Sequence, residues 1–131
     1  MKTMIQTIIF DAAPHDIYEI LMDSKKHSFL TGDKAVISRK EGGKIKAYGD
    51  YIEGKNLKLV QDKLIVQSWR ASDWPKGHYS TITFKFKKDK KKTILIFSQE
   101  DIPEYFYSKI KQGWIDFYWN PLKYMTKQTK N

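Results

Sequence analysis

The sequence predicts an α+β fold of the helix-grip kind, in which a curved antiparallel sheet of about six to seven strands wraps around a long C-terminal helix. Three observations predict it. Residues 3–10 alternate in the manner of a strand and are rich in β-branched side chains. The period-two pattern returns over 35–100, interrupted only by short turns, so consecutive strands should be mainly antiparallel. Residues 104–127 then change to the period of an amphipathic helix.

The segment 104–127 is the predicted helix that the sheet encloses. Its apolar residues recur at helical spacing and should share one inner face, made by Ile110, Trp114, Phe117, Leu122 and Met125. Two residues disturb this pattern. Gly113 weakens a helix by about 1 kcal/mol relative to Ala and leaves room for a close approach. Pro121 lacks a backbone donor, so it should kink the helix or end its regular part near Asn120.

Two short helices are expected between the first strand and the rest of the sheet. Pro14 suits the first turn of a helix over 15–22, and Asp23 or Ser24 can cap a second helix that ends at Gly32. After them, the strands are expected at 35–39, 44–48, 51–53, 57–60, 64–71, 78–87 and 93–100. The stretch 54–56, which begins with Gly54, is predicted to be a turn or a bulge between two of them.

Length and composition restrict the class of protein. A chain of 131 residues fits a single domain over 1–131, and an aromatic content of 15% predicts a core of large rings. The chain contains no cysteine, which excludes disulfides and thiolate chemistry. It shows no signal peptide and no apolar run of bilayer length, so we expect a cytoplasmic protein without a membrane span.

The chain is strongly basic, with 24 Lys and Arg against 15 Asp and Glu and a formal charge of +9. Nearly all these cations are lysines, since Arg occurs only at positions 39 and 70. Arginine is the usual reader of bases and phosphates, so the charge does not predict specific nucleic-acid binding. It favours solubility and, as a partner, an acidic protein surface.

The residues that could carry catalysis form no convincing constellation. The three histidines lack the spacing of metal ligands. Asp73, His78 and Ser80 could formally supply a carboxylate, a base and a nucleophile, but structural roles at a loop and a strand edge are favoured. We expect no catalytic residue, no metal and no cofactor, and enzymatic activity stays an open question.

The aromatic residues predict a cavity. Alternation sends Trp69 toward the concave face of the sheet and Arg70 toward the outer face, where Asp73 or Glu53 could pair with it. Large rings on a curved sheet do not fill all the space beneath a helix, although the same rings can also form a solid core. The candidate lining residues are Tyr51, Trp69, Ser80, Phe84, Phe106, Ile110, Gly113, Trp114, Phe117 and Tyr118. Such a cavity suits a small, mostly apolar molecule whose polar end is oriented by the hydroxyls of Tyr51 and Ser80.

Four segments resemble a known family in their order and spacing. They are 49–54 (Gly-Asp-Tyr-Ile-Glu-Gly), 66–70 (Val-Gln-Ser-Trp-Arg), 74–80 (Trp-Pro-Lys-Gly-His-Tyr-Ser) and 113–122, from Gly-Trp to Asn-Pro-Leu. Together they resemble the Activator of Hsp90 ATPase homologue 1-like family of the START-like (Bet v 1-like, SRPBCC) superfamily, over about 5–125. The resemblance implies the helix-grip fold with a cavity between its long helix and its sheet.

The resemblance also implies two classes of function. Single-domain members are suspected of binding small hydrophobic ligands. In multi-domain eukaryotic members, a domain of this type follows an N-terminal domain that does much of the Hsp90 binding. Because 131 residues leave no room for that N-terminal domain, the sequence favours non-enzymatic ligand binding. The alternative is a protein-interaction module, a co-chaperone-like partner of Hsp90 acting through its basic surface. A third hypothesis, an enzyme of the cyclase, hydrolase or aromatase type, would need converging polar groups inside the cavity.

Overall fold

A computed structural model describes residues 1–129 and confirms the helix-grip fold. Seven strands form one sheet in the order β1-β7-β6-β5-β4-β3-β2, and every neighbouring pair is antiparallel. The strands are β1 (Lys2–Phe10), β2 (Val36–Ile37), β3 (Lys44–Ala47), β4 (Ile52–Val60), β5 (Leu64–Ala71), β6 (Ser80–Asp89) and β7 (Lys92–Ile102). The helical segments are α1 (Pro14–Met22), α2 (Ser24–Thr31), η1 (Glu104–Phe106), α3 (Tyr107–Trp114), η2 (Ile115–Trp119) and α4 (Asn120–Thr129).

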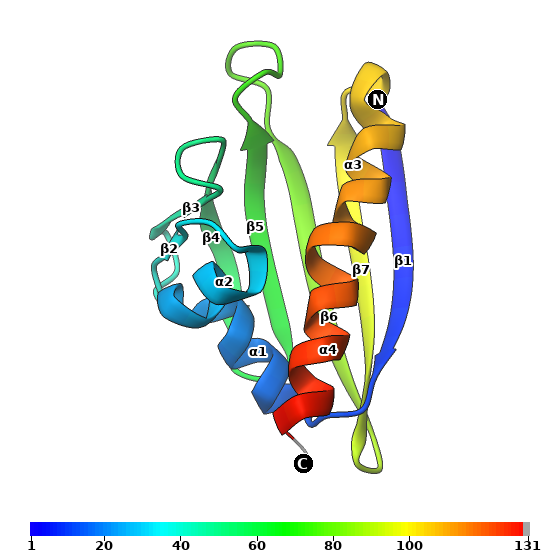
Figure 1. The fold of residues 1–131 in the computed structure, drawn as a ribbon. Coiled ribbons are helices and arrows are strands. Elements are labelled where there is room, and N and C mark those ends of the chain that lie inside the picture. The colour runs from blue at the N-terminus through cyan, green and yellow to red at the C-terminus, as the bar shows by residue number, and fades with distance from the viewer. Residues whose placement is uncertain (130–131) are drawn as a thin grey trace.

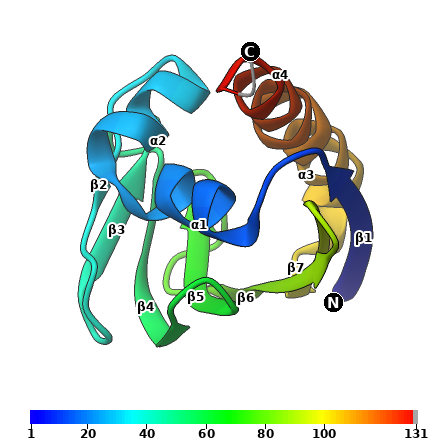
Figure 2. The ribbon, with the colours of Figure 1, turned by 90° about the horizontal axis from the view of Figure 1, so that it is seen from below.

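The sheet is strongly curved, and the helices lie inside the curve (Figures 1 and 2). The C-terminal helical segments run along the side of β1 and β7, whereas α1 and α2 lie toward the opposite side of the sheet. Inward-pointing residues from both layers meet in a hydrophobic core, and Ile65, Leu95, Phe97 and Leu122 are fully buried. The concave face and the helices therefore share one hydrophobic interior.

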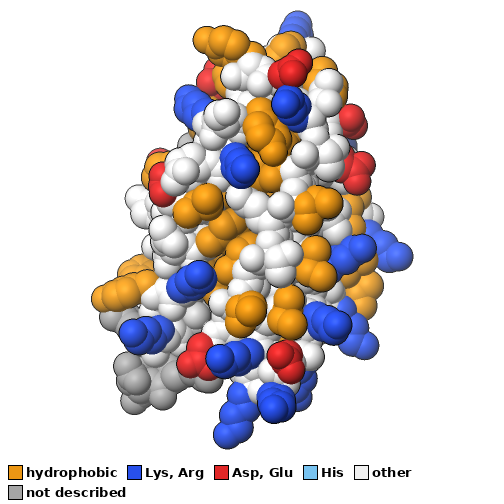
Figure 3. Space-filling model, turned by 90° about the vertical axis from the view of Figure 1, so that its right-hand side faces the viewer, with side chains coloured by type: hydrophobic (Ala, Val, Ile, Leu, Met, Phe, Trp, Pro, Cys, Tyr) orange, Lys and Arg blue, Asp and Glu red, His pale blue; other side chains and the backbone are white. Residues whose placement is uncertain are grey.

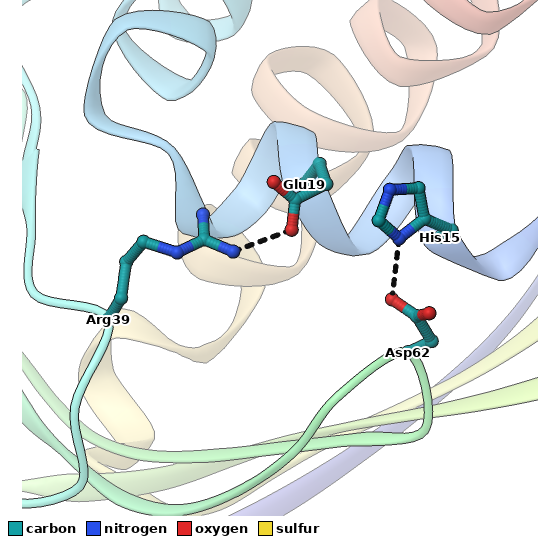
Figure 4. Close-up of polar contacts among 4 residues, drawn as sticks. All are labelled: His15, Glu19, Arg39 and Asp62. Carbon is teal, nitrogen blue, oxygen red and sulfur yellow. Dashed lines mark hydrogen bonds and ion pairs between the residues drawn. The ribbon is translucent and has the colours of Figure 1, made fainter.

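The two short helices begin and end at the residues that the sequence indicates. Asp23 caps α2 by accepting a hydrogen bond from the Lys26 amide at 2.9 Å. Gly32 ends α2 with a left-handed φ of 76°. Two polar contacts then hold α1 to the sheet side (Figure 4): His15 Nδ1 lies 3.0 Å from Asp62 Oδ1, and Arg39 Nη2 donates to Glu19 Oε2 at 2.6 Å.

The segment 54–56 partly corrects the sequence analysis, because it holds no turn and the irregularity begins only at its last residue, Asn56. Strand β4 runs unbroken through it, with Gly54 paired to Ile45 on β3 and to Trp69 on β5. The bulge lies further on, between Asn56 and Lys58. A Cβ atom at position 54 would collide with the backbone carbonyl oxygen of Ser68. Glycine is therefore needed here for the close approach of two strands.

The long C-terminal helix differs from the expected continuous amphipathic helix. It contains a π-helical segment, η2, in which the Asn120 amide donates to the Ile115 carbonyl, five residues back. One extra residue in a turn rotates the following side chains by about 100°. As a result Phe117, expected on the inner face, is 52% exposed, while Trp119 takes an inward position and is 3% exposed.

Pro121 does not end the helix, because α4 continues to Thr129. Proline clashes with the carbonyl four residues back in a regular helix and cannot donate to it. In this chain, the widened π segment lies directly before Pro121 and absorbs that mismatch. The sequence analysis predicts an irregularity near Asn120, and the structure places a π segment at Ile115–Trp119, directly before it.

Candidate ligand cavity between helix and sheet

A cavity of about 430 Å³ lies between the C-terminal helix and the β3–β5 part of the sheet. It is lined by Asp33, Tyr48, Tyr51, Ile52, Trp69, Lys109, Ile110, Gly113, Trp114, Phe117 and Tyr118. Most of these are aromatic or aliphatic, and the charged side chains of Asp33 and Lys109 are exposed to solvent. The volume lies within the range of small-molecule sites.

The structure brings together most of the candidate residues. Those that line the cavity are Tyr51, Trp69, Ile110, Gly113, Trp114, Phe117 and Tyr118. Three others lie elsewhere. Phe84 packs inside the core, with its ring centroid 5.1 Å from that of Phe97. The ring centroid of Phe106 lies 6.4 Å from that of Trp74. Ser80 is buried, and its hydroxyl is hydrogen-bonded to the Trp69 backbone carbonyl and to the Gln99 side chain. It is therefore not placed to orient a ligand in this cavity.

Four lining residues, Asp33, Tyr48, Ile52 and Lys109, were not among the candidates. Tyr48 is the informative one. It follows the buried Ala47, so strand alternation predicts that it points outward. Its backbone instead has a positive φ of 54°, which ends β3 and turns the ring toward the helix. The ring centroid of Tyr48 lies 5.7 Å from that of Phe117. Only the turn residues that follow, Gly49 and Asp50, hint at this reversal.

A buried hydrogen-bond chain fixes the two tryptophans of the cavity wall. The Trp114 indole N–H donates to Gln99 Oε1 at 2.8 Å, and Gln99 Nε2 donates to Ser80 Oγ at 2.9 Å. Ser80 Oγ then donates to the Trp69 carbonyl at 2.8 Å. The ring centroids of Trp69 and Trp114 are 5.7 Å apart. In the sequence, the signal of this series of hydrogen bonds is the polar residue Gln99 at an inward-pointing strand position.

His27 and Tyr118 form a second buried polar contact behind the cavity. The Leu21 carbonyl can only accept, so His27 Nδ1 carries a proton and donates to it at 2.9 Å. His27 Nε2 therefore accepts from the Tyr118 hydroxyl at 2.8 Å. Burial lowers the pKa of His27 and raises the pKa of Tyr118. Burial, with a smaller contribution from the Asp33 carboxylate, raises the pKa of Tyr48 to about 12. These groups are neutral near pH 7.

The His27 contact predicts that acid destabilises the fold before the carboxylates titrate. The folded state depresses the pKa of His27, so the unfolded chain takes up the proton first, below its ordinary pKa of about 6.5. Stability should be fully present above about pH 6.5 and fall by up to about 1.4 kcal/mol per pH unit below it. Urea unfolding between about pH 7.5 and 5.5 measures this slope, and His27→Gln should flatten it. An equal slope in both proteins would assign the effect to other groups.

The polar residues near the 74–78 loop do not form a catalytic triad. His78 Nε2 lies 2.7 Å from the Asp101 carbonyl, and Asp73 accepts from the Tyr51 hydroxyl at 3.0 Å. Ser80 bonds to neither of them. Arg70 also differs from expectation, because it donates to the carbonyls of Trp74, Pro75 and His78 rather than pairing with a carboxylate. It holds the loop closed behind Trp69.

Residues 1–129 contain neither a membrane-spanning helix nor a cluster of metal ligands. No helix in this part of the chain is long and apolar enough to cross a membrane. No group of three or more His, Asp or Glu residues in it could hold a metal ion.

A curved antiparallel sheet closed by a long helix over an aromatic cavity defines a helix-grip protein of the START-like class. The family model described as "Activator of Hsp90 ATPase homolog 1-like protein" matches residues 11–126. The chain belongs to this family.

Curated relatives agree with this family, and a solved structure agrees with the fold. An Activator of 90 kDa heat shock protein ATPase homolog from Dictyostelium discoideum is 34% identical over 114 residues, which are 86% of this chain and 30% of the relative. The human homolog 1 is 29% identical over 87% of this chain and 34% of its own length. The chain thus spans about a third of these curated relatives. A crystal structure of an Hsp90 activator from Plasmodium falciparum superposes with a TM-score of 0.90 at 22% identity, covering 95% of this chain and 96% of that one.

Proposed function

We propose that this protein binds a small, flat, mostly apolar molecule in the cavity between α3–η2 and the sheet, without chemical conversion. The observation that carries the proposal is the aromatic lining of the 430 Å³ cavity, with Trp69, Trp114 and Tyr118 on its walls. Rings supply large contact areas at fixed positions, and ring faces suit a planar guest. Among the described residues that line the cavity, the two charged ones, Asp33 and Lys109, are exposed and would leave the interior apolar.

Filling the cavity should abolish binding. A side chain at Gly113 starts at the cavity wall, where a Cβ atom would meet nothing closer than Phe117 Cδ2 at 3.9 Å. Gly113→Phe should therefore remove ligand binding and preserve the fold. Gln112→Phe adds the same ring at the neighbouring exposed position and is the matched control. Tryptophan fluorescence during titration with flavonoid-like, sterol and fatty-acid probes measures binding, because two tryptophans line the cavity.

The proposal expects saturable quenching by at least one probe class, insensitive to salt, in the wild type and in Gln112→Phe. Equal binding by Gly113→Phe would move the ligand out of the cavity. No response to any probe from folded protein would mean that the cavity does not serve these molecules.

A second function, in which the basic surface of this protein binds an acidic surface of an Hsp90-class chaperone, is favoured by a separate feature. On the outer face of the sheet, Lys44 stands directly opposite Lys55 in the β3–β4 ladder. Like charges in this arrangement are destabilising, which suggests that the pair serves an anionic partner. A shallow hollow of about 680 Å³ surrounds the pair and is also lined by Lys46, Glu53, Ser68 and Tyr79. Membership of the family supports the choice of chaperone.

Charge reversal tests whether binding depends on this surface or only on the net positive charge of the protein. Lys44→Glu with Lys55→Glu should weaken binding to an Hsp90 at least about tenfold, because two attractive contacts become repulsive. Lys90→Glu with Lys91→Glu makes the same change in net charge at the β6–β7 hairpin and should have little effect. Calorimetry in low and high salt measures both, and binding should weaken as salt screens the charges. Equal losses from the two double variants would contradict a specific site.

A further inference from the structure

Strand β1 is an open edge of the sheet. It is nine residues long and pairs with β7 on one side, while the sheet ends on its other side. The opposite edge is formed by β2, which has only two residues. Proteins protect long edges with lysines, prolines, bulges or covering segments, since free backbone groups invite another strand. The short β2 follows this rule, whereas β1 has a lysine and a register irregularity only at its start, between Lys2 and Met4.

The composition of β1 sets it apart from the rest of a basic chain. No charged residue occurs between Lys2 and Asp11, in a chain with 24 cationic side chains. Two isoleucines of this stretch point to the outer face and are unusually exposed, Ile5 by 69% and Ile9 by 58%. Ile96 on the adjacent β7 extends the apolar surface and is 37% exposed. Figure 3 shows several apolar side chains on this side of the molecule, with charged side chains among them toward the top and more lysines and arginines at the bottom.

The sequence of β1 is complementary to itself under two-fold symmetry. If two copies pair antiparallel about Thr7, then Ile5 of each lies opposite Ile9 of the other, and Thr7 lies opposite Thr7. Moving the centre to Gln6 would place Ile5 against Thr7, and moving it to Ile8 would place Ile5 against Asp11. A centre at Ile5 would pair Ile5 with itself but would place Ile9 against Met1 and Lys2 against Ile8. The Thr7-centred pairing is the one that sets both outward isoleucines of β1 against isoleucines of the other copy.

We propose that β1 docks against β1 of a second copy of this chain, so that the two sheets join into one. An acidic partner would gain nothing from a strip without positive charge, whereas an identical strip satisfies both the free backbone groups and the exposed isoleucines. Each copy carries a formal charge of +9, so long-range repulsion opposes the association. Salt screens that repulsion beyond about 8 Å at physiological ionic strength, and the dimer should tighten as salt rises. A chaperone held by lysines responds in the opposite direction.

Cross-linking tests the register directly, because the chain contains no cysteine. Thr7→Cys should form a disulfide dimer under mild oxidation, since the two Cα atoms on the axis lie about 5 Å apart. Ile9→Cys alone should not, because its copies are separated by four residue positions, or about 13 Å. A mixture of Ile5→Cys and Ile9→Cys should give the mixed dimer in preference to either homodimer. Equal cross-linking of all single variants would indicate random collision and overturn the pairing.

Sedimentation of the cysteine-free protein supplies the second readout. The wild type should show a dimer at high micromolar concentration that becomes stronger with salt. Ile5→Lys should shift the protein to monomer, because each copy would then place a charged lysine against Ile9 of the other copy. Val36→Lys adds the same charge on the β2 edge, where Val36 is 50% exposed, and should leave the dimer intact. A wild type that remains monomeric in low and high salt would overturn the proposal, whatever the cavity binds.

Discussion

Trp114→Ala is expected to lower the free energy of unfolding by about 3–5 kcal/mol, the range for deleting a large buried ring. Trp114 is 3% exposed although it lines the cavity. Its ring centroid lies 4.4 Å from that of Phe97 and 4.6 Å from that of Tyr118. The change would also leave Gln99 Oε1 buried without its donor, at a further cost of about 1–3 kcal/mol. Because domains are stable by only about 5–15 kcal/mol, much of the protein should unfold.

Urea denaturation measures this loss against two comparison variants. Trp114→Phe keeps most of the ring area and should lose mainly the hydrogen bond to Gln99. Phe117→Ala removes a ring that lines the same cavity but is 52% exposed, and it should cost less than about 1.5 kcal/mol. If Trp114→Ala were no more destabilised than Phe117→Ala, the buried aromatic cluster would not be the core of this fold.

This expectation changes how the cavity is to be tested. The helical pattern alone treats Trp114 and Phe117 as equivalent residues of the inner face. The structure separates them: Trp114 belongs to both the core and the cavity wall, and Phe117 belongs only to the rim. A cavity-filling change at Gly113 removes neither Trp114 nor Phe117, so it is the cleaner test of binding.

Sequence periodicity was sufficient where the backbone is regular. Alternation placed Trp69 inward and Arg70 outward, and the helical period placed Ile110 and Trp114 toward the sheet. These positions follow from fixed geometry, with periods of 2.0 and 3.6 residues.

Periodicity failed where one residue leaves the regular backbone. The π segment rotates Phe117 out and Trp119 in, and the left-handed φ of Tyr48 turns its ring toward the helix. Their sequence signals, Pro121 after the π segment and Gly49-Asp50 after Tyr48, mark an irregularity without giving its form. The hydrogen-bond partners of buried polar side chains cannot be read from the pattern either. Ser80 was expected to face a ligand, but it is held by Gln99, which lies nineteen positions away in the sequence.

Gly54→Ala is expected to lower the free energy of unfolding, which reverses the usual rule for glycine in a strand. Alanine ordinarily stabilises a strand or helix interior by about 0.5–1 kcal/mol relative to glycine. At position 54 the added Cβ would run into the carbonyl oxygen of Ser68 and would lie 3.2 Å from the amide nitrogen of Trp69. Both are backbone atoms of β5, so they cannot move without opening the β4–β5 ladder. We expect a loss of at least about 2 kcal/mol, in the range of overpacked sites.

Gly113→Ala is the matched control, because the same added atom meets only Phe117 Cδ2 at 3.9 Å. It should raise stability by about 1 kcal/mol through helix propensity. Chemical unfolding of the two variants side by side should therefore give changes of opposite sign. A gain from both would mean that β4 and β5 can separate freely at Gly54. In that case the wall that carries Trp69 would be mobile, and the cavity would not be a preformed site.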